Sequence, residues 1–165
     1  PNISVELEVD YLANKSKYAA DHLVFTGPID AFFDYRFGKL PYRSLEFQHE
    51  HYADTEWFQP VGTMNFPNEH EYTRITEFKH LTGQVHPGTS IVKEFPRSEG
   101  EPYYPIPCSE TEEIYQRYKS EAEKMEDTTF VGRLAQYRYY NMDQVVGAAL
   151  TAAQNILSKL GAPNA

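Results

Sequence analysis

Arginine and tyrosine are concentrated in residues 132–143, which read Gly-Arg-Leu-Ala-Gln-Tyr-Arg-Tyr-Tyr-Asn-Met-Asp. The segment leads into a predicted helix, whose first turn offers unpaired backbone N–H groups and the positive end of the helix dipole to an anion. The guanidinium of Arg133 can hold two phosphate oxygens at once. The pattern therefore indicates a phosphate or diphosphate site. Spacing alone leaves an alternative, in which Asn141 only caps the helix and the tyrosines only pack.

A second arginine, Arg74, stands in the segment 72–80, Tyr-Thr-Arg-Ile-Thr-Glu-Phe-Lys-His. If this segment is a strand, Arg74 shares one face with Thr76, Phe78 and His80, because side chains alternate along a strand. A guanidinium on such a face is costly unless a ligand or a carboxylate meets it. The sequence therefore predicts either a ligand site at Arg74 or an ion pair with an acidic neighbour.

Two further patterns are weaker. Tyr103 and Tyr104 stand between prolines that favour an extended backbone, so their hydroxyls suit phosphate or sugar groups, although the rings could equally plug a core. His49 and His51 would share a strand face but lack a third ligand, and we assign no metal site. The sequence contains neither a Gly-x-Gly-x-x-Gly nor a phosphate-binding-loop motif, and no Gly-x-Ser-x-Gly nucleophile motif.

Composition bounds the class of protein. The chain has 165 residues, enough for one domain or a large piece of a bigger protein, and its single cysteine, Cys108, excludes an intramolecular disulfide. A net charge of -9 without a basic face argues against nucleic acid as a partner. No apolar run approaches the roughly 20 residues of a membrane helix, and we expect a cytoplasmic protein.

The expected elements begin with an alternating strand over residues 3–9. Because the chain enters this strand directly from Pro1, we expect the sequence to be cut from the middle of a larger fold. A short strand over 22–28 stops at Gly-Pro, and a short helix follows over 29–37. Period-two patterns then predict an antiparallel meander. Its strands are expected within 42–52, 57–66, 72–81 and 89–95.

Two helices are predicted in the last third of the chain. The first begins at a capping-box pattern, Ser109 to Glu112, and runs to Asp127. The second begins at an N-cap, Asn141, with Gln144 at the third helical position, and carries a continuous apolar stripe. We expect that stripe to pack against something large and apolar.

Seven blocks of sequence add a resemblance to these patterns. They are Phe25-Thr-Gly-Pro-Ile-Asp-Ala-Phe-Phe-Asp-Tyr, Leu40-Pro-Tyr-Arg-Ser-Leu, Asn65-Phe, Tyr72-Thr-Arg-Ile-Thr-Glu, Lys93-Glu-Phe-Pro, Glu101-Pro-Tyr-Tyr-Pro-Ile and the segment 132–143. Together they closely resemble the UDP-galactopyranose mutases, a family of bacterial flavoenzymes. Any one block would be weak evidence, whereas their order and near-family spacing over almost all of residues 1–160 are specific.

The resemblance covers the C-terminal portion of the family's chain, and it implies an α+β fold. We expect residues 1–38 to be part of an FAD-binding domain, with strands and a short helix. Residues 39–107 are expected to form the antiparallel, substrate-facing sheet. Residues 108–165 are expected to complete the FAD-binding domain with the C-terminal helix.

The resemblance implies an isomerase that converts UDP-galactopyranose into UDP-galactofuranose for a cell envelope, through an adduct between the sugar and N5 of reduced FAD. The expected small-molecule partners are these two nucleotide-sugars, and a homodimer is the assembly expected of the full-length enzyme. We expect the 165 residues alone to bind FAD weakly and not to turn over.

The matched motifs also imply residue roles. Arg74 resembles the arginine that neutralises the UDP diphosphate, and Asn65, Tyr104 and Tyr139 resemble substrate contacts, so that Arg74, Tyr104 and Tyr139 are the catalytic candidates. The expected FAD contacts are Tyr11, Arg133, Tyr140, Asn141, Met142, Asp143, Gln144 and Val145. Many bacterial members have Asp at the position of Asn141. The resemblance therefore implies that Asn141 caps the helix, but it implies no proton-transfer role for this neutral amide.

Two alternatives stay open at the level of sequence. One is a flavin amine oxidase-like enzyme of the same fold that acts on another substrate. The other is a non-catalytic module that binds a sugar-nucleotide, which the absence of a glycine-rich dinucleotide motif favours.

Overall fold

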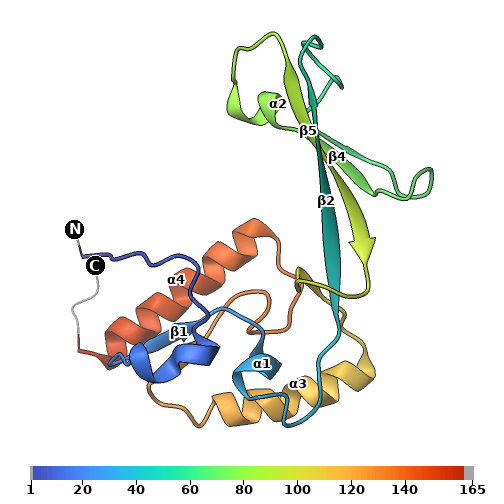
Figure 1. The fold of residues 1–165 in the computed structure, drawn as a ribbon. Coiled ribbons are helices and arrows are strands. Elements are labelled where there is room, and N and C mark those ends of the chain that lie inside the picture. Colours follow the sequence, from blue (N-terminus) through green and yellow to red (C-terminus); the bar gives the residue numbers. More distant parts are fainter. Residues whose placement is uncertain (1, 162–165) are drawn as a thin grey trace. The chain divides into compact units, whose positions relative to one another are not determined.

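The computed structural model describes residues 2–161 and divides into two units (Figure 1). Unit 1 consists of the described residues up to Pro41 together with those from Tyr104 onward. Unit 2 is Tyr42–Tyr103. The expected domain boundaries lie a few residues from these limits, and the assignment of the parts to an FAD-binding and a substrate domain stays a prediction.

Unit 1 combines short strands with helices. Its sheet is a parallel pair in which Leu23 is opposite Thr128 and Phe25 is opposite Phe130. The elements of unit 1, in chain order, are the 3-10 helix η1 Leu12–Lys17, β1 Leu23–Phe25, α1 Ile29–Phe32, β6 Tyr104–Pro105, α3 Ser109–Ala122, β7 Thr128–Phe130 and α4 Met142–Lys159.

Aromatic rings fill the core of unit 1. Phe25 and Phe32 are buried with ring centroids 4.9 Å apart, and Phe130 meets the edge of Phe32 at 4.8 Å. Such tilted and edge-on contacts stabilise a pair beyond the area that it buries. Ala135, only 1% exposed, belongs to the same cluster. The chain after β7 is therefore tied to the core just beyond Arg133.

The expected strand over residues 3–9 is wrong. Residues 2–10 form no strand, and the apolar side chains of Ile3, Val5 and Leu7 are largely exposed. An alternating pattern becomes a strand only when a second strand pairs with its backbone. Within residues 2–161 no strand pairs with this segment, so the apolar face has nothing to pack on.

Unit 2 is built on antiparallel strands in the order β3-β4-β5-β2. The predicted strand over 42–52 is confirmed. Figure 1 shows β2, in teal, running beside β5, with α2 near the end of this pair where Tyr52 is opposite Thr89. The elements are β2 Tyr42–Tyr52, β3 Thr63–Asn65, β4 Arg74–Glu77, α2 Phe78–Thr82 and β5 Thr89–Arg97. The order is not that of a simple meander, because β2 pairs with the last strand and not with β3.

The predicted strand over 72–81 is wrong in its second half. The strand ends at Glu77, and a short helix, α2, begins at Phe78 and ends before Gly83 in the left-handed conformation. His80 therefore does not continue the face of Arg74, and its imidazole reaches back to the Glu77 carboxylate at 3.3 Å. The predicted strand over 57–66 is likewise reduced to three residues, Thr63–Asn65.

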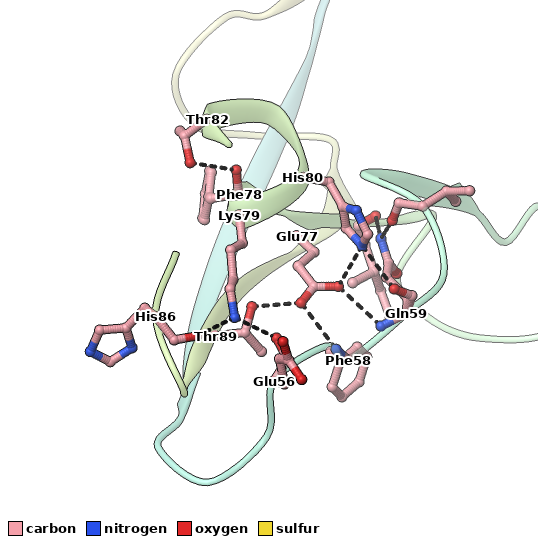
Figure 2. Close-up of polar contacts among 12 residues, drawn as sticks. Glu56, Phe58, Gln59, Glu77, Phe78, Lys79, His80, Thr82, His86 and Thr89 are labelled. Carbon is pink, nitrogen blue, oxygen red and sulfur yellow. Dashed lines mark hydrogen bonds and ion pairs between the residues drawn. The ribbon is translucent and has the colours of Figure 1, made fainter. Parts of the chain in front are cut away.

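The carboxylate of Glu77 is fully buried and organises this end of unit 2 (Figure 2). One oxygen accepts the Phe58 amide at 3.0 Å and the Thr89 hydroxyl at 2.6 Å, and the other accepts the Gln59 amide at 3.0 Å. Burial alone would raise the pKa of Glu77, but these hydrogen bonds and the nearby His80 hold that pKa below its ordinary value. The buried group is therefore a carboxylate and not a neutral acid.

Lys79 is the opposite charge buried two residues away, with 5% of its surface exposed. Its ammonium donates to the Glu56 carbonyl at 2.7 Å, and to the carbonyls of His86 and Gly88, and it lies 4.6 Å from the centre of the Trp57 ring. A buried ammonium needs all of its N–H groups satisfied. The contacts of Lys79 therefore fix the loops before β3 and before β5 to α2 (Figure 2).

The two long helices begin differently from one another. The N-cap of helix α3 is Cys108, one residue before the predicted Ser109. The Cys108 amide donates to Thr111 Oγ1 at 2.8 Å. Helix α4 starts as predicted after Asn141. None of the described residues of α4 is buried. Met142, Val146 and Leu150, and Leu160 at the C-cap, are each more than half exposed, whereas Val145 and Ile156 are half-buried. The apolar stripe of α4 is thus only partly covered in the described part of the chain.

The fold is mixed α and β, with an antiparallel sheet and a C-terminal helix, as the sequence predicts. Across residues 2–161, the search for a helix both long and apolar enough to cross a membrane finds none.

The role of Glu77 can be tested by Glu77→Gln. An amide side chain has only one acceptor oxygen and no charge, so we expect hydrogen exchange at the Phe58 and Gln59 amides to accelerate roughly tenfold or more at neutral pH, since a hydrogen bond to a charged acceptor contributes about 1.5–3 kcal/mol. The control is Glu99→Gln, which alters an exposed carboxylate of the same unit. Unchanged protection in Glu77→Gln would contradict the role.

The same substitution also changes the response to acid. Because the folded-state pKa of Glu77 is lowered, its contribution to the free energy of unfolding is complete above the ordinary glutamate pKa of about 4.3 and is lost as pH falls through the lower folded value. Urea unfolding at pH 7 and pH 3 should therefore show a smaller acid-induced loss in Glu77→Gln than in the unsubstituted protein.

Candidate functional site

Arg133 is the centre of the candidate site in unit 1. Its guanidinium carbon lies 5.0 Å from the centre of the Tyr104 ring and 5.1 Å from that of Tyr139, and the two rings stack on each other at 5.6 Å and 19°. Its Nη2 donates to the Tyr140 carbonyl at 2.5 Å. Aromatic faces and a carbonyl orient a guanidinium without cancelling its charge. In the described part of the chain no carboxylate forms an ion pair with Arg133.

The N-terminus of α4 follows immediately. Asn141 is the N-cap, and its amide donates to Gln144 Oε1 at 2.9 Å, which is one half of a capping box. Asp143 lies in the first turn, and Met142 is 86% exposed. The helix is 18 residues long, so its positive end adds to the charge of Arg133 in the same region.

A tight turn brings Arg133 to this position. Gly132 has φ +102° and its amide donates to the Gln136 side chain at 3.1 Å, while the Arg138 amide donates back to the Arg133 carbonyl at 3.0 Å. Tyr137 has φ +44°, which a bulky residue rarely adopts. The turn reverses the chain, and Tyr139 and Tyr140 therefore return to the side of Arg133.

A cavity of about 440 Å³ lies next to these tyrosines, between α3 and residues 136–140. Tyr115 forms part of its wall, and burial, with the charge of Glu112, raises the pKa of Tyr115 to about 12. The phenol is therefore neutral at physiological pH. The residues that line the cavity are Pro107, Glu112, Tyr115, Gln116, Lys119, Gln136, Tyr137, Arg138, Tyr139 and Tyr140.

Arg74 is the centre of a second group, in unit 2. The strand register places Asn65, Arg74, Glu94 and Phe47 opposite one another in one row across β3, β4, β5 and β2. Arg74 Nε donates to Asn65 Oδ1 at 3.1 Å, and its Nη1 lies 3.6 Å from a Glu94 carboxylate oxygen. The predicted ion pair with an acidic neighbour is thus present. The Arg74 side chain is still 42% exposed, so part of its fork faces solvent.

The predicted site residues thus form two groups. Arg74 and Asn65 meet in unit 2, and Arg133, Tyr104, Tyr139 and Tyr140 meet in unit 1, beside the α4 N-terminus. Two predicted cofactor contacts lie differently. The Tyr11 ring packs 6.3 Å from Phe25 at the margin of the aromatic core, and Val145 is half-buried in the first turns of α4.

Two residues were not singled out by the sequence. Glu94 is the partner of Arg74, and an acidic residue in a strand gives no sign of which arginine will face it, because register is set by distant pairing. Tyr137 is 3% exposed and holds the turn that carries Arg133. Its only sequence signal is its place in the segment 132–143, two residues before Tyr139.

Comparison with known proteins identifies similar sequences. Residues 1–139 match the sequence profile of a family described as UDP-galactopyranose mutase. A "Probable UDP-galactopyranose mutase" of Klebsiella pneumoniae is 38% identical over 164 residues, covering 96% of this chain and 42% of the relative. A UDP-galactopyranose mutase of Mycoplasma genitalium is 34% identical over 145 residues, covering 82% of this chain and 36% of the relative.

A relative whose name gives a different substrate is equally similar. A "dTDP-fucopyranose mutase" of Escherichia coli is 38% identical over 166 residues, covering 93% of this chain and 43% of the relative. The chain thus spans about two fifths of the length of the curated relatives that it matches.

The contribution of the α4 cap can be tested by Asn141→Asp. Aspartate keeps the capping geometry and adds a negative charge at the positive helix end, so we expect α4 to become more stable by about 0.3–1 kcal/mol at low salt. The measurement is thermal loss of helical circular dichroism. Asn155→Asp makes the same change in the C-terminal half of α4 and should give no gain; equal gains at both positions would contradict the dipole effect.

Proposed function

We propose a function for this chain, which belongs to the UDP-galactopyranose mutase family: it is part of an isomerase that interconverts UDP-galactopyranose and UDP-galactofuranose. The observation that carries the proposal is the Arg133 guanidinium, which is held by two tyrosine rings and a carbonyl with no carboxylate partner in residues 2–161. A fixed positive charge beside a helix N-terminus is suited to a diphosphate.

The residues around Arg133 fit the diphosphate of FAD. The guanidinium and the first-turn amides of α4 supply the charge and the donors, and Asn141 and Gln144 hold the helix end in place. Reduced FAD, when bound, supplies the nucleophile for the anomeric carbon of the sugar. The residues of this chain bind and orient the anion. This role does not need a titratable side chain at position 141, where the chain has a neutral amide.

Arg74 is assigned to the diphosphate of the nucleotide-sugar. Its Nε is occupied by Asn65, and its Nη1 is near Glu94, so the guanidinium is oriented while part of it is open to solvent. When the nucleotide leaves the sugar, negative charge grows on the departing phosphate, and a preoriented guanidinium stabilises that charge. Tyr104 and Tyr139 supply flat faces and hydroxyls for the sugar.

The nucleotide of the substrate has a second candidate. Because the dTDP-fucopyranose mutase is as similar to this chain as the Klebsiella relative, at 38% identity, a dTDP-sugar is the alternative to UDP-galactose. Offering UDP-galactopyranose and dTDP-fucopyranose separately to the complete enzyme with reduced flavin, and separating the products by chromatography, distinguishes the two.

The remaining assignments belong to the same proposal. The complete enzyme is cytoplasmic, uses FAD in its reduced form and assembles as a homodimer. The 165 residues alone bind FAD weakly and do not turn over, which an assay of the purified chain with dithionite and UDP-galactofuranose would test.

Arg74→Ala in the complete enzyme should lower kcat/KM by roughly 100-fold or more, because a preoriented donor to developing charge is removed. Flavin should stay bound, since Arg74 is assigned to the substrate and not to the cofactor. Steady-state kinetics and the flavin absorbance of the purified enzyme give the two readouts. Arg117→Ala, an exposed arginine on α3, is the control. Near-normal turnover in Arg74→Ala would refute the diphosphate role.

Arg133→Ala should instead lower the flavin content. The substitution removes the fixed charge next to the α4 N-terminus, so we expect the dissociation constant of FAD to rise roughly tenfold or more, in line with a lost charge-assisted hydrogen bond. The ratio of flavin to protein after purification and FAD titration of the apoenzyme measure this. Arg36→Ala removes an exposed arginine that pairs with Glu121 and should leave the ratio unchanged. Full flavin retention in Arg133→Ala counts against the assignment of Arg133 to the FAD diphosphate.

A further inference from the structure

We propose that Tyr137 is a positioning residue of the candidate site: its buried hydroxyl joins the segment that carries Arg133 and Tyr139 to the segment that carries Tyr104. The inference rests on the proposed function, because it concerns the geometry of the same site. Nothing in the site itself requires Tyr137 to touch a ligand, since its side chain is buried and only 3% of its surface is exposed.

The backbone of Tyr137 is in a conformation that its side chain does not favour. Its φ of +44° lies in the left-handed region, which is unfavourable for a residue with a Cβ atom. The turn nevertheless needs a residue of this conformation, because the Tyr137 amide donates to the Leu134 carbonyl at 3.3 Å and the chain then reverses toward Tyr139. A large aromatic side chain at such a position indicates that its tertiary contacts stabilise the conformation.

Those contacts are made by the hydroxyl. It donates to the Pro41 carbonyl at 2.7 Å, has the Ile106 carbonyl as a second acceptor at 3.0 Å, and accepts the Ile106 amide at 3.3 Å. Burial raises the pKa of Tyr137, so the hydroxyl keeps its proton and continues to donate. The neighbouring Tyr115 ring lies 5.9 Å away and covers one side.

The positions of these bonds in the chain make them relevant to the site. Ile106 is two residues after Tyr104, and Tyr139 is two residues after Tyr137. The hydrogen bond between the Tyr137 hydroxyl and Ile106 therefore fixes the distance between segments 104–106 and 137–139. The tyrosines of these two segments, Tyr104 and Tyr139, stack at 5.6 Å, and the Arg133 guanidinium packs on both rings. Without the hydroxyl the two segments can separate, and the Arg133 guanidinium is no longer held in a fixed position for binding a diphosphate.

The test is Tyr137→Phe in the complete flavoenzyme, which keeps the ring and removes only the hydroxyl. We expect the dissociation constant of FAD and the KM for the nucleotide-sugar each to rise roughly tenfold, with the melting temperature of the apoenzyme within about 4 °C of normal. Tyr118→Phe is the matched control, because it removes a buried tyrosine hydroxyl of the same unit that donates to the Gly38 carbonyl at 2.7 Å and accepts the Phe37 amide at 3.0 Å. Within residues 2–161, no hydrogen bond joins that hydroxyl to Arg133, Tyr104 or Tyr139. Tyr118→Phe should leave both constants unchanged.

A merely structural contribution would lower the melting temperature and leave the FAD dissociation constant and KM within twofold of normal, and this result overturns the inference. The double substitution of Tyr137→Phe and Arg133→Ala decides whether the effect passes through Arg133: the Tyr137→Phe effect on FAD affinity should vanish in the Arg133→Ala background, and full additivity contradicts the inference.

The failure of the proposed function gives a different result. If Arg133→Ala leaves FAD affinity unchanged, the assignment of Arg133 to the FAD diphosphate is wrong. If Arg133→Ala lowers FAD affinity but Tyr137→Phe does not, only the positioning role of Tyr137 is refuted. If Tyr137→Phe does not accumulate as folded protein, Tyr137→His, whose ring N–H can donate to the Pro41 carbonyl, is measured in the same two backgrounds. An FAD dissociation constant of Tyr137→His within twofold of normal supports the positioning role. A tenfold rise of that constant in a normally folded Tyr137→His enzyme overturns it.

Discussion

Unit 2 depends on a carboxylate that is removed from water. Glu77 ends a four-residue strand with none of its surface exposed, and a buried charge is tolerated only when hydrogen bonds replace its hydration. The loop at Phe58 and Gln59 and the hydroxyl of Thr89 supply those bonds. Lys79 satisfies the opposite requirement with carbonyls. The two loops are thus ordered by polar groups and not by an apolar core, and β4, which carries Arg74, is held at its far end.

Unit 1 follows a different principle around its candidate site. The charge of Arg133 is supported by ring faces and a carbonyl, all of which are neutral, so the site is organised without being neutralised. Arg74 in unit 2 is the contrasting case, because Glu94 offsets part of its charge. An arginine with an acidic neighbour must share its N–H donors between that neighbour and a bound anion. Arg133, which rests on aromatic rings, uses an N–H group for the Tyr140 carbonyl and offers the others to an anion. This difference supports the proposed roles, in which Arg133 holds a cofactor tightly and Arg74 binds a substrate that must leave.

Much of the fold could be predicted where a local pattern is decisive. The alternation over 42–52 is long, and it gives a strand of those bounds, while Asn141 and Gln144 mark the start of α4 by cap chemistry alone. The alternation over 3–9 fails because a strand needs a partner that local sequence does not provide. The pairing of Arg74 with Glu94 and the left-handed Tyr137 depend on contacts between residues 20 to 96 positions apart, which no short window can contain.

The single tryptophan of the chain gives the molecule an internal reporter. Trp57 lies in unit 2 with its ring 4.3 Å from that of His80 and beneath the Lys79 ammonium, so tryptophan fluorescence responds to the loops around Glu77 and to little else. The long helices α3 and α4 both belong to unit 1, and they dominate far-ultraviolet circular dichroism. Emission and ellipticity consequently follow different units, and any separation of the two denaturation curves measures the cooperativity between them.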